Sequence, residues 1–474
     1  MAEAPPTPGP SDRTDVVVLG AGPAGLVAAW HAARAGHGVV VLERGAAPGG
    51  MAASLEVGGQ RVDLGSHRLH PSTDPALLSE LREVLGPNLQ WRGRNGSLRL
   101  DGSWVRLPLV TGDLVRTLPP RFVAGAAREA VLARFRSSGH PRPDTFAEVV
   151  RAGLGPTMLE RFYGPYARKL WGLPADELSG ELARRRIAAR SPGALLARLR
   201  SRDGGPAGFW YPATGFGAIP EALTAAATAA GAAFRCGADV TGLDLTDPTS
   251  VTATLAGGAS LRAGLVLSTV PLPVLARITQ PPPPATVARA AGGLGSRAMV
   301  LVYLVLARPR WTGFDAHYLP GPEQRASRVS EPKGYRDGPD PEDRTVLCVE
   351  VPCARGDETW SAPDDELAAT LAVELEAGCL PAVRPVEVVT RRLPAVYPVL
   401  RPGQERDLAE VDAWAAGLHR VTTLGRGGLF THDNSHHAMA LGAAAAAALR
   451  TGGGWDPAAW SDARQRARSH VVED

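Results

Sequence analysis

The chain has 474 residues, of which 44% are hydrophobic and 21% are charged, the balance of an ordinary globular protein. Its 51 basic and 48 acidic residues leave a net charge of +3, which excludes a strongly basic nucleic-acid or membrane-surface binder. Four cysteines without a CxxC pair exclude a disulfide framework, and no apolar run is long enough to span a membrane. We therefore expect two or three domains and a reducing, cytoplasmic environment.

The beginning of the chain is rich in proline and polar side chains and lacks the apolar core of a signal peptide. We expect a disordered tail over residues 1–12. Residues 15–20 then form an apolar, β-branched run, which is typical of a strand buried on both faces of a parallel sheet.

A glycine turn follows this strand. The sequence G-A-G-P-A-G occupies residues 20–25, and a small-residue helix continues from it to Gly36, where a C-terminal cap belongs. A second predicted strand, over residues 38–42, is followed by Glu43. A strand, a glycine turn, a helix, a strand and an acidic residue in this order predict a dinucleotide-binding unit.

Each part of this unit has a physical role. Gly20 allows the tight turn, Gly22 lets backbone N–H groups approach a pyrophosphate, and Gly25 lets the helix pack closely on the strand. The helix N-terminus stabilises phosphate charge, and Glu43 accepts hydrogen bonds from ribose hydroxyls. The predicted cofactor contacts here are Gly20, Gly22, Pro23, Ala24, Gly25 and Glu43.

The segment after Glu43 favours FAD over NAD. It continues as an E-R-x(4)-G-G sequence, which resembles the flavoprotein version of this unit, in which a second glycine pair approaches the cofactor. An NAD domain would more often run straight into another helix. We expect FAD, held non-covalently because neither His67 nor any cysteine lies in a covalent-flavin signature, with further contacts from Arg44, Gly49, Gly50 and Met51.

The middle of the chain mixes strands and helices. Glycine pairs and alternation predict hairpins over residues 53–64 and 96–107, and a mostly helical pattern extends from about residue 111 to 202. Three short strands are expected within residues 233–270, and the four prolines 281–284 form a stiff connector.

Strands resume in the second half of the chain. They are predicted over residues 298–306, 345–351, 385–392 and 422–424, with helices over 365–377 and 436–450. Residues 320–344 are rich in glycine, proline and charge, which predicts a long surface loop.

These elements predict an α/β fold in which a Rossmann-like FAD-binding domain, of the glutathione-reductase type, carries inserted helical and mixed-sheet substrate-binding domains. The predicted divisions are residues 13–71, 206–280 and 406–455 for the discontinuous FAD-binding domain, 72–205 for a mostly helical substrate cap, 281–405 for a β-rich substrate-binding insertion and 456–474 for a C-terminal tail.

Several segments carry a resemblance to a known family. Residues 65–70 (GSHRLH) are similar to G-P-H-x-F-H, residues 163–172 look like Y-x-x-K-x-W-G, and residues 425–434 are similar to a G-R-x(7)-D/N flavin-contacting motif. The layout resembles the FAD-dependent amine oxidase and protoporphyrinogen-oxidase-like superfamily, and these motifs resemble its UDP-galactopyranose mutase branch. Residues 267–271 (LSTVP) are closer to the desaturase and protoporphyrinogen-oxidase version.

The resemblance implies further cofactor contacts: Gly65, Ser66 and His67 against the isoalloxazine ring, the backbone of Val240 at the adenine, and Gly425, Arg426, Asn434 and Ser435 near the phosphates or the ring. The helix that follows Asn434 would direct its positive end at the flavin N1–C2=O locus, where hydride arrival at N5 leaves negative charge.

The candidate catalytic side chains are His67, Arg68, Lys169, Trp171 and Arg186. His67 faces the flavin or supports the turn, and Lys169 and Trp171 belong to the roof of the site or to helix packing. Arg186 ends a run of three arginines, which lies on a solvated face or grips a phosphate or carboxylate in the substrate pocket.

A metal site is not expected. Of His432, His436 and His437, the last two are adjacent and cannot share one helix face, and no carboxylate completes a plausible ligand set.

Three functions remain open. The first is an FAD-dependent oxidoreductase that transfers hydride from a small organic substrate to flavin N5, by desaturation or by amine or alcohol oxidation, with an anionic substrate among the options. The second is a redox-neutral nucleotide-sugar mutase, which the motifs around His67 and Lys169 favour and Ser66 and Leu69 oppose. The third is a non-enzymatic binding protein on the same fold.

Overall fold

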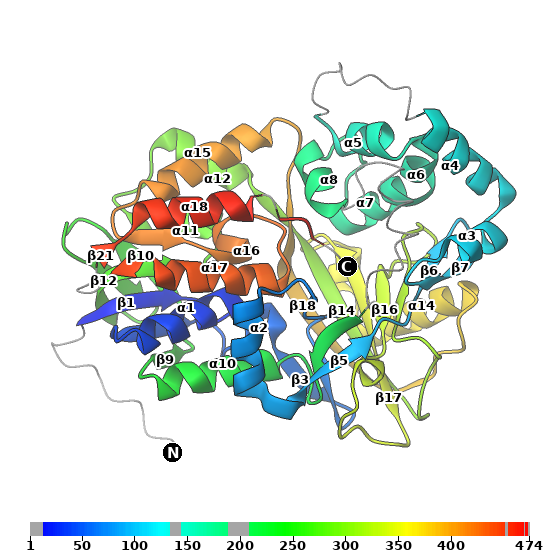
Figure 1. The fold of residues 1–474 in the computed structure, drawn as a ribbon, viewed down its shortest axis with the longest axis horizontal. Coiled ribbons are helices and arrows are strands. Elements are labelled where there is room, and N and C mark those ends of the chain that lie inside the picture. Colours follow the sequence, from blue (N-terminus) through cyan, green and yellow to red (C-terminus); the bar gives the residue numbers. More distant parts are fainter. Residues whose placement is uncertain (1–12, 133–143, 188–207, 451–453, 469, 473–474) are drawn as a thin grey trace.

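The computed structural model describes residues 13–132, 144–187, 208–450, 454–468 and 470–472 (Figure 1). The predicted tail over residues 1–12 lies outside them, as do two stretches of the predicted cap, 133–143 and 188–205. Within the described residues, no helix is both long and apolar enough to cross a membrane.

One of two large sheets contains the strands of the dinucleotide-binding unit. Its order is β13-β10-β11-β12-β1-β2-β9, and β19 pairs with β12. The central strands β12, β1 and β2 are parallel. The bounds are β1 Arg13–Leu19, β2 Val39–Glu43, β9 Ala233–Cys236, β10 Val240–Asp244, β11 Val251–Leu255, β12 Ser260–Ser268, β13 Thr279–Gln280 and β19 Val421–Thr423.

Strand β1 is buried on both faces, as its apolar run predicts. Val16 and Val18 belong to the apolar cluster on one face, and Val17 and Leu19 to the cluster on the other. Helices pack on both faces because each alternate row of side chains needs an apolar partner. The first cluster includes α1 (Pro23–Arg34), α2 (Pro75–Leu85), α10 (Ala218–Ala229), α17 (Ser435–Ala447) and α18 (Pro457–Ala467), and the second includes α11 (Leu272–Ile278), α12 (Ala285–Gly293) and α15 (Gln404–Ala416).

The predicted glycine turn leads into α1. Gly22 is the N-cap residue, Pro23 occupies the first turn, where its missing N–H costs nothing, and Gly36 follows the helix with a positive φ of 90°. The sequence prediction of this strand–turn–helix unit is confirmed.

Helix α1 packs against its neighbours through backbone. A Cβ atom on Gly25 would lie 2.0 Å from the carbonyl oxygen of Gly20, and a Cβ on Gly442 of α17 would lie 2.2 Å from that of Ala24. Only glycine fits at either position, so α1 lies unusually close to both β1 and α17.

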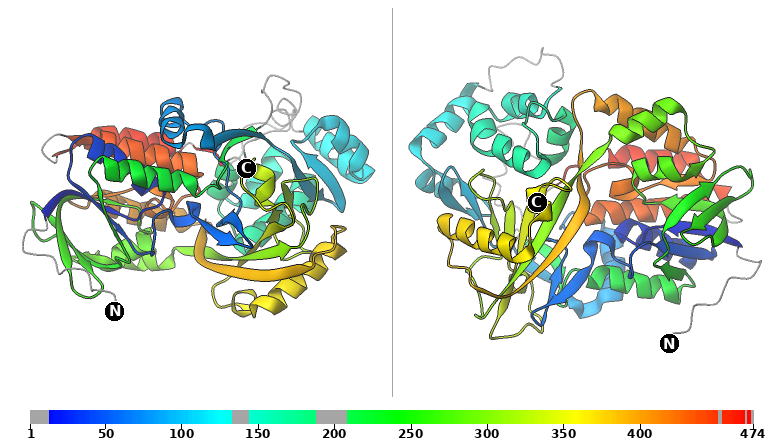
Figure 2. Two further views of the ribbon diagram at one scale, coloured as in Figure 1. Left: turned by 90° about the horizontal axis from the view of Figure 1, so that it is seen from below. Right: turned by 180° about the vertical axis from the view of Figure 1, so that it is seen from behind.

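The second large sheet is mixed and has the order β18-β14-β17-β16-β15-β6-β7. Strand β14 pairs antiparallel with β17 and β18, and α14 (Asp364–Ala377) packs on one face. Figure 2 shows α14 and the helices α3 and α4 on opposite sides of this sheet. The bounds are β6 Gly96–Leu100, β7 Ser103–Leu107, β14 Gly295–Leu306, β15 Ala316–Tyr318, β16 Arg328–Ser330, β17 Thr345–Cys353 and β18 Pro385–Val399.

Both predicted hairpins are present. Strands β3 (Ser54–Val57) and β4 (Gln60–Asp63) pair antiparallel, as do β6 and β7. The β6–β7 turn places Asp101 and Gly102 at positive φ, the conformation that an Asp-Gly turn favours.

The predicted cap segment contains strands as well as helices. Strand β5 (Leu89–Gly93) pairs with β8 (Gly208–Pro212), and β6 pairs with β15 of the mixed sheet. The helices are α3 Thr111–Thr117, α4 Pro120–Leu132, α5 Phe146–Gly153, α6 Pro156–Met158, α7 Gly164–Trp171 and α8 Gly180–Arg186, with a π-helical turn at Leu159–Tyr163. The domain boundaries stay predictions.

Two sequence predictions are corrected. Residues 320–344 are not a surface loop: they contain β16 and a 3₁₀ turn (Pro332–Tyr335), and Glu331, Tyr335 and Arg336 are buried. Their charges are compensated inside the fold, since Arg336 pairs with Asp340. Residues 233–270 hold four strands, because the first predicted run divides into β9 and β10.

The backbone contact between α1 and α17 yields the first prediction. Gly442→Ala should lower the free energy of unfolding by about 1–3 kcal/mol, because its Cβ would overlap the Ala24 carbonyl and push the helices apart. Gly292→Ala is the matched control, since Gly292 is an exposed position of α12 with nothing near its Cβ. Urea unfolding measures both; equal stability of the two variants would contradict the contact.

Candidate functional site

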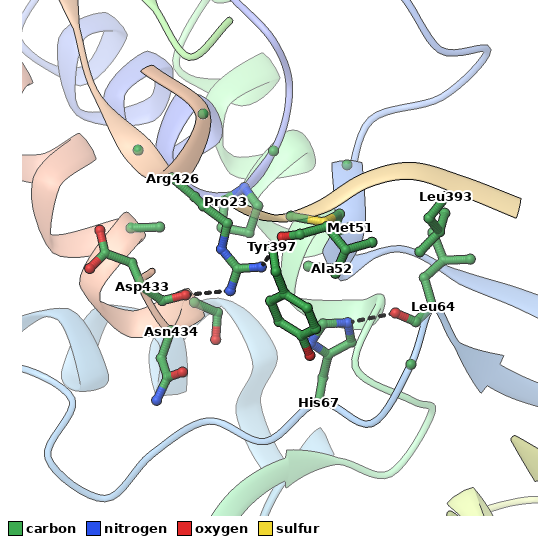
Figure 3. Close-up of a pocket in the computed structure, with 18 of the residues that line it drawn as sticks. Pro23, Met51, Ala52, Leu64, His67, Leu393, Tyr397, Arg426, Asp433 and Asn434 are labelled. Carbon is green, nitrogen blue, oxygen red and sulfur yellow. Dashed lines mark hydrogen bonds between the residues drawn. The ribbon is translucent and has the colours of Figure 1, made fainter. Parts of the chain in front are cut away.

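A cavity of about 450 Å³ opens beside the N-termini of α1 and α17 (Figure 3). Most of the predicted site residues line it: Gly20, Gly22, Pro23, Ala24, Glu43, Gly50, Met51, Gly65, Ser66, His67, Arg68, Arg186, Gly425, Arg426, Asn434 and Ser435. Six do not: Gly25, Arg44, Gly49, Lys169, Trp171 and Val240. Sixteen residues from separate sequence motifs therefore lie around one cavity.

The two glycine turns lie against each other at one end of the cavity. A Cβ on Gly50 would lie 3.1 Å from the Cα of Gly22, whereas a Cβ on Gly22 would meet nothing within 4 Å. Gly22 has an ordinary φ of −77°, so backbone strain does not require glycine there. The open space beside the α1 N-terminus fits an approaching diphosphate.

Glu43 is held at this end by the backbone. Its carboxylate accepts hydrogen bonds of 2.7 Å from the N–H groups of Ala21 and Gly45. The N–H of Ala238 donates to the carbonyl of Glu43, which ties the start of β10 to the same corner. Val240 begins β10 but is absent from the cavity lining, so its adenine contact remains a prediction from the resemblance.

His67 is enclosed in the cavity wall. Its ring stacks on Phe216 at 5.2 Å, and Nε2 lies 3.0 Å from the carbonyl oxygen of Leu64. Burial lowers its pKa, which the charge of Asp63 only partly opposes. A carbonyl can only accept, so the neutral ring donates from Nε2 and keeps its lone pair on Nδ1.

Residues before α17 form the opposite wall. Arg426, on α16 (Gly425–Gly428), donates to the backbone carbonyls of Asp433 and Val396, as Figure 3 shows for Asp433. Asn434 caps α17, and Ser435 begins it. The positive end of this helix thus opens on the cavity.

The carboxylate of Asp433 is buried, and neither oxygen has a hydrogen-bond partner among the described residues. Burial raises its pKa to about 6, against the influence of Arg185 and Arg426. An unpartnered buried carboxylate is costly, and the hydroxyl-rich chain of a flavin nucleotide is a group that can supply the missing donors. Together with the open cradle at Gly22, this acceptor fits FAD.

One expectation about metal ligands is wrong. Asp433 lies beside His437 and His470, with atoms capable of ligation within 4.8 Å of one another, so a carboxylate does accompany these histidines. The two rings, however, stack at 4.1 Å and 18°, which directs their in-plane lone pairs alongside each other and not at one point. Burial and neighbouring histidines lower the pKa of His437 to about 2. The absence of a metal stays a prediction.

Lys169 and Trp171 are absent from the residues that line the cavity, which favours helix packing over a role in the roof of the site. The Lys169 ammonium donates to the backbone carbonyls of Leu319 and Ala326, and burial lowers its pKa to about 8. Trp171 is buried and donates from Nε1 to His432 at 3.3 Å. Helix packing, the second interpretation of this motif, describes both residues.

Arg186 lies on the cavity and not on a solvated face. Its guanidinium lies 5.7 Å from the ring centroids of both Trp171 and Tyr397. Of the three arginines at the end of α8, Arg186 is therefore oriented by aromatic contacts.

The sequence analysis missed an ion pair in the cavity wall. Both oxygens of Glu350 accept hydrogen bonds of 2.9 Å from Arg328, and one oxygen also accepts from the Ser66 N–H at 2.7 Å. A glutamate within the wholly buried strand β17 was the available signal. Arg94, Tyr318 and Tyr397 also line the cavity, and nothing in their local sequence indicated it.

Comparisons with known proteins give a family and a fold for this chain. A family model described as flavin containing amine oxidoreductase matches residues 23–452. A phytoene dehydrogenase of Streptomyces griseus is 31% identical over 304 residues, which are 57% of this chain and 56% of that protein. The chain thus spans about half the length of the curated relatives it matches.

Solved structures share the fold over nearly the whole chain. A reduced UDP-galactopyranose mutase has a TM-score of 0.77 at 22% identity and covers 91% of this chain and 93% of its own. A putrescine oxidase has a TM-score of 0.66 at 19% identity, over 92% and 98%.

The open cradle yields a prediction about cofactor binding. Gly22→Asp should leave the fold intact, because φ is ordinary and the space is empty, but should deplete the purified protein of flavin, since its carboxylate would repel the diphosphate. Gly112→Asp is the control: Gly112 lies in the first turn of α3, also with an empty surrounding, away from the cavity. Flavin absorbance per chain measures the effect; full flavin in Gly22→Asp would refute this placement.

The packing role of Lys169 yields another. Lys169→Met should destabilise the fold by about 1–3 kcal/mol, because two buried carbonyls lose a donor. Flavin content and the rate of flavin reduction should stay at the wild-type level. Thermal unfolding and stopped-flow reduction measure the two effects, and a collapse of reduction in a stable variant would restore a catalytic role.

Proposed function

The chain belongs to the family of flavin containing amine oxidoreductases, and on that premise we propose that it oxidises a small organic substrate with FAD as hydride acceptor. Membership makes it an FAD-dependent oxidoreductase; the substrate and the bond that is oxidised are the proposal.

The observation that carries this proposal is the continuity of the cavity. The cradle at Gly22, the turn at His67 and a further group of aromatic and charged side chains, which includes Phe209, Tyr318 and Arg328, line one hollow. A substrate can therefore lie beside the cofactor in a space that the protein encloses.

The bound cofactor would supply the hydride acceptor at flavin N5. The turn at Gly22 and the N-terminus of α1 would hold its diphosphate, and Glu43 its ribose. The N-terminus of α17, opened by Asn434 and Ser435, would stabilise the negative charge that reduction creates. Because burial keeps His67 neutral, its Nδ1 is a candidate acceptor for the proton that an amine or alcohol substrate loses.

The charges in the cavity bear on the substrate. Arg68, Arg94 and Arg328 line the cavity together with His67. A long hydrocarbon would offer no acceptor to the guanidinium groups of Arg68 and Arg94, which lack an ion pair among the described residues. Oxidation of a C–N or C–O bond in a polar substrate therefore fits better than desaturation of a purely apolar one.

A redox-neutral mutase is the second candidate. Arg186, Arg68 and Arg94 on the cavity favour it, since arginines suit the diphosphate of a nucleotide sugar. The positions of Lys169 and Trp171 away from the cavity weaken it, because their motif was one of its supports. The non-enzymatic alternative does not agree with family membership.

The purified protein should be yellow, with a flavin absorbance band at about 450 nm. Denaturation and ultrafiltration should release the flavin as free FAD. Anaerobic mixing with substrate should bleach this absorbance at a rate that saturates with substrate. Amines and alcohols with and without a negative charge form the test set. A colourless protein that takes up no FAD would contradict the proposal, and a reaction that requires flavin reduced beforehand, with product at the substrate's oxidation state, would support the mutase.

A further inference from the structure

Arg68 is a half-buried cation, and no carboxylate among the described residues forms an ion pair with it. Its guanidinium lies 4.8 Å from the ring centroid of Phe209 and 4.9 Å from that of Tyr335, and it donates to the Tyr318 hydroxyl at 3.2 Å. Across the described parts of the chain, no ion pair includes Arg68, and its Nε is buried without a hydrogen-bond partner.

The carboxylates closest to Arg68 form ion pairs with other arginines. Glu350 is committed to Arg328 through two hydrogen bonds, and Asp315, whose charge acts on Arg68, pairs with Arg310 at 3.8 Å. Aromatic faces offset only part of the cost of enclosing a guanidinium that stays protonated. A charge enclosed in this way is stabilised by an anion that enters the cavity.

A second arginine of the same cavity, Arg94, follows a segment that pairs with β8. Arg94 lines the cavity, and no ion pair among the described residues includes it. Strand β8 connects the two arginines. Gly93, which precedes Arg94, pairs with Gly208 of β8. Leu69, which follows Arg68, pairs with Trp210, two residues further along the same strand. The two arginines therefore flank one end of this strand, where Gly208 and Phe209 line the cavity.

We propose that Arg68 and Arg94 form an anion subsite of the substrate pocket, which binds a carboxylate or phosphate group of the substrate and so fixes its orientation. The inference rests on the proposed function, because it assumes that this end of the cavity receives substrate. A guanidinium group binds a carboxylate or a phosphate through paired N–H donors. The subsite is therefore assigned to an anionic oxygen group of either kind.

The test is a calorimetric titration of the flavin-loaded enzyme with three probes that share a phenyl ring: benzoate, phenyl phosphate and the uncharged benzamide. At least one anion should bind about tenfold more tightly than benzamide, since hydrogen bonds to a charged partner are the stronger ones. The better anion identifies the headgroup.

Arg68→Met and Arg94→Met should each weaken binding of that anion about tenfold or more and leave benzamide unaffected. Arg82→Met is the matched control. The Arg82 guanidinium also lies over an aromatic ring of β8, 4.3 Å from the centroid of Trp210, but it is exposed and does not line the cavity. Its replacement should not change anion binding.

Anions that bind no better than benzamide, or that bind both arginine variants as tightly as wild type, would overturn the subsite. If Arg68→Met does not fold, Arg94→Met alone decides. A variant that shifts the flavin reduction potential yet keeps full anion affinity would also overturn it and make Arg68 a cofactor contact. Flavin content is measured first: a wild-type protein without flavin contradicts the proposed function, whereas a flavin-loaded protein indifferent to anions contradicts only the subsite.

Discussion

The rest of the structure depends on two close backbone contacts of α1, each made at a glycine. Gly25 rests on the carbonyl of Gly20, and Gly442 rests on that of Ala24, so α1 lies against β1 and α17 at backbone distance. This approach brings the N-termini of two helices to one cavity. Two positive helix ends in one place favour bound negative charge, first on a diphosphate and then on a reduced flavin. A bulkier residue at either glycine would separate the elements that make the site.

The local half of this design could be predicted from the sequence. The glycine turn, α1 and Glu43 lie within about thirty residues of one another, and their spacing alone implies their geometry. The pair of Arg328 and Glu350 could not be predicted, because it belongs to the site only through contacts such as that between Ser66 and Glu350, 284 residues apart. Residues 320–344 were misjudged for a related reason: composition does not reveal that distant partners bury and neutralise their charges. A sequence motif also does not determine where a side chain points: the Lys169 ammonium donates to the carbonyls of Leu319 and Ala326 and does not line the cavity.

Some charged groups of the cavity have a partner within the protein and others lack one among the described residues. Arg328 and Glu350 satisfy each other, and the pair holds the turn at Ser66 in place. In contrast, Asp433 near α17 and Arg68 near Phe209 are enclosed without such partners. Enclosed groups that the fold leaves unsatisfied are the ones that a ligand can complete, since the protein has already borne their desolvation. We infer that the cofactor supplies the missing hydrogen-bond donors of Asp433 and the substrate supplies an anionic partner for Arg68.

The central claim is that the α1 turn and Glu43 hold the adenosine diphosphate half of FAD. Calorimetric titration of the flavin-stripped protein with FAD and with FMN tests it most directly, because FMN lacks the adenosine and one of the two phosphates. The account predicts one FAD per chain and binding of FMN weaker by at least about a hundredfold, or about 2.7 kcal/mol. Equal affinity for the two flavins would contradict it.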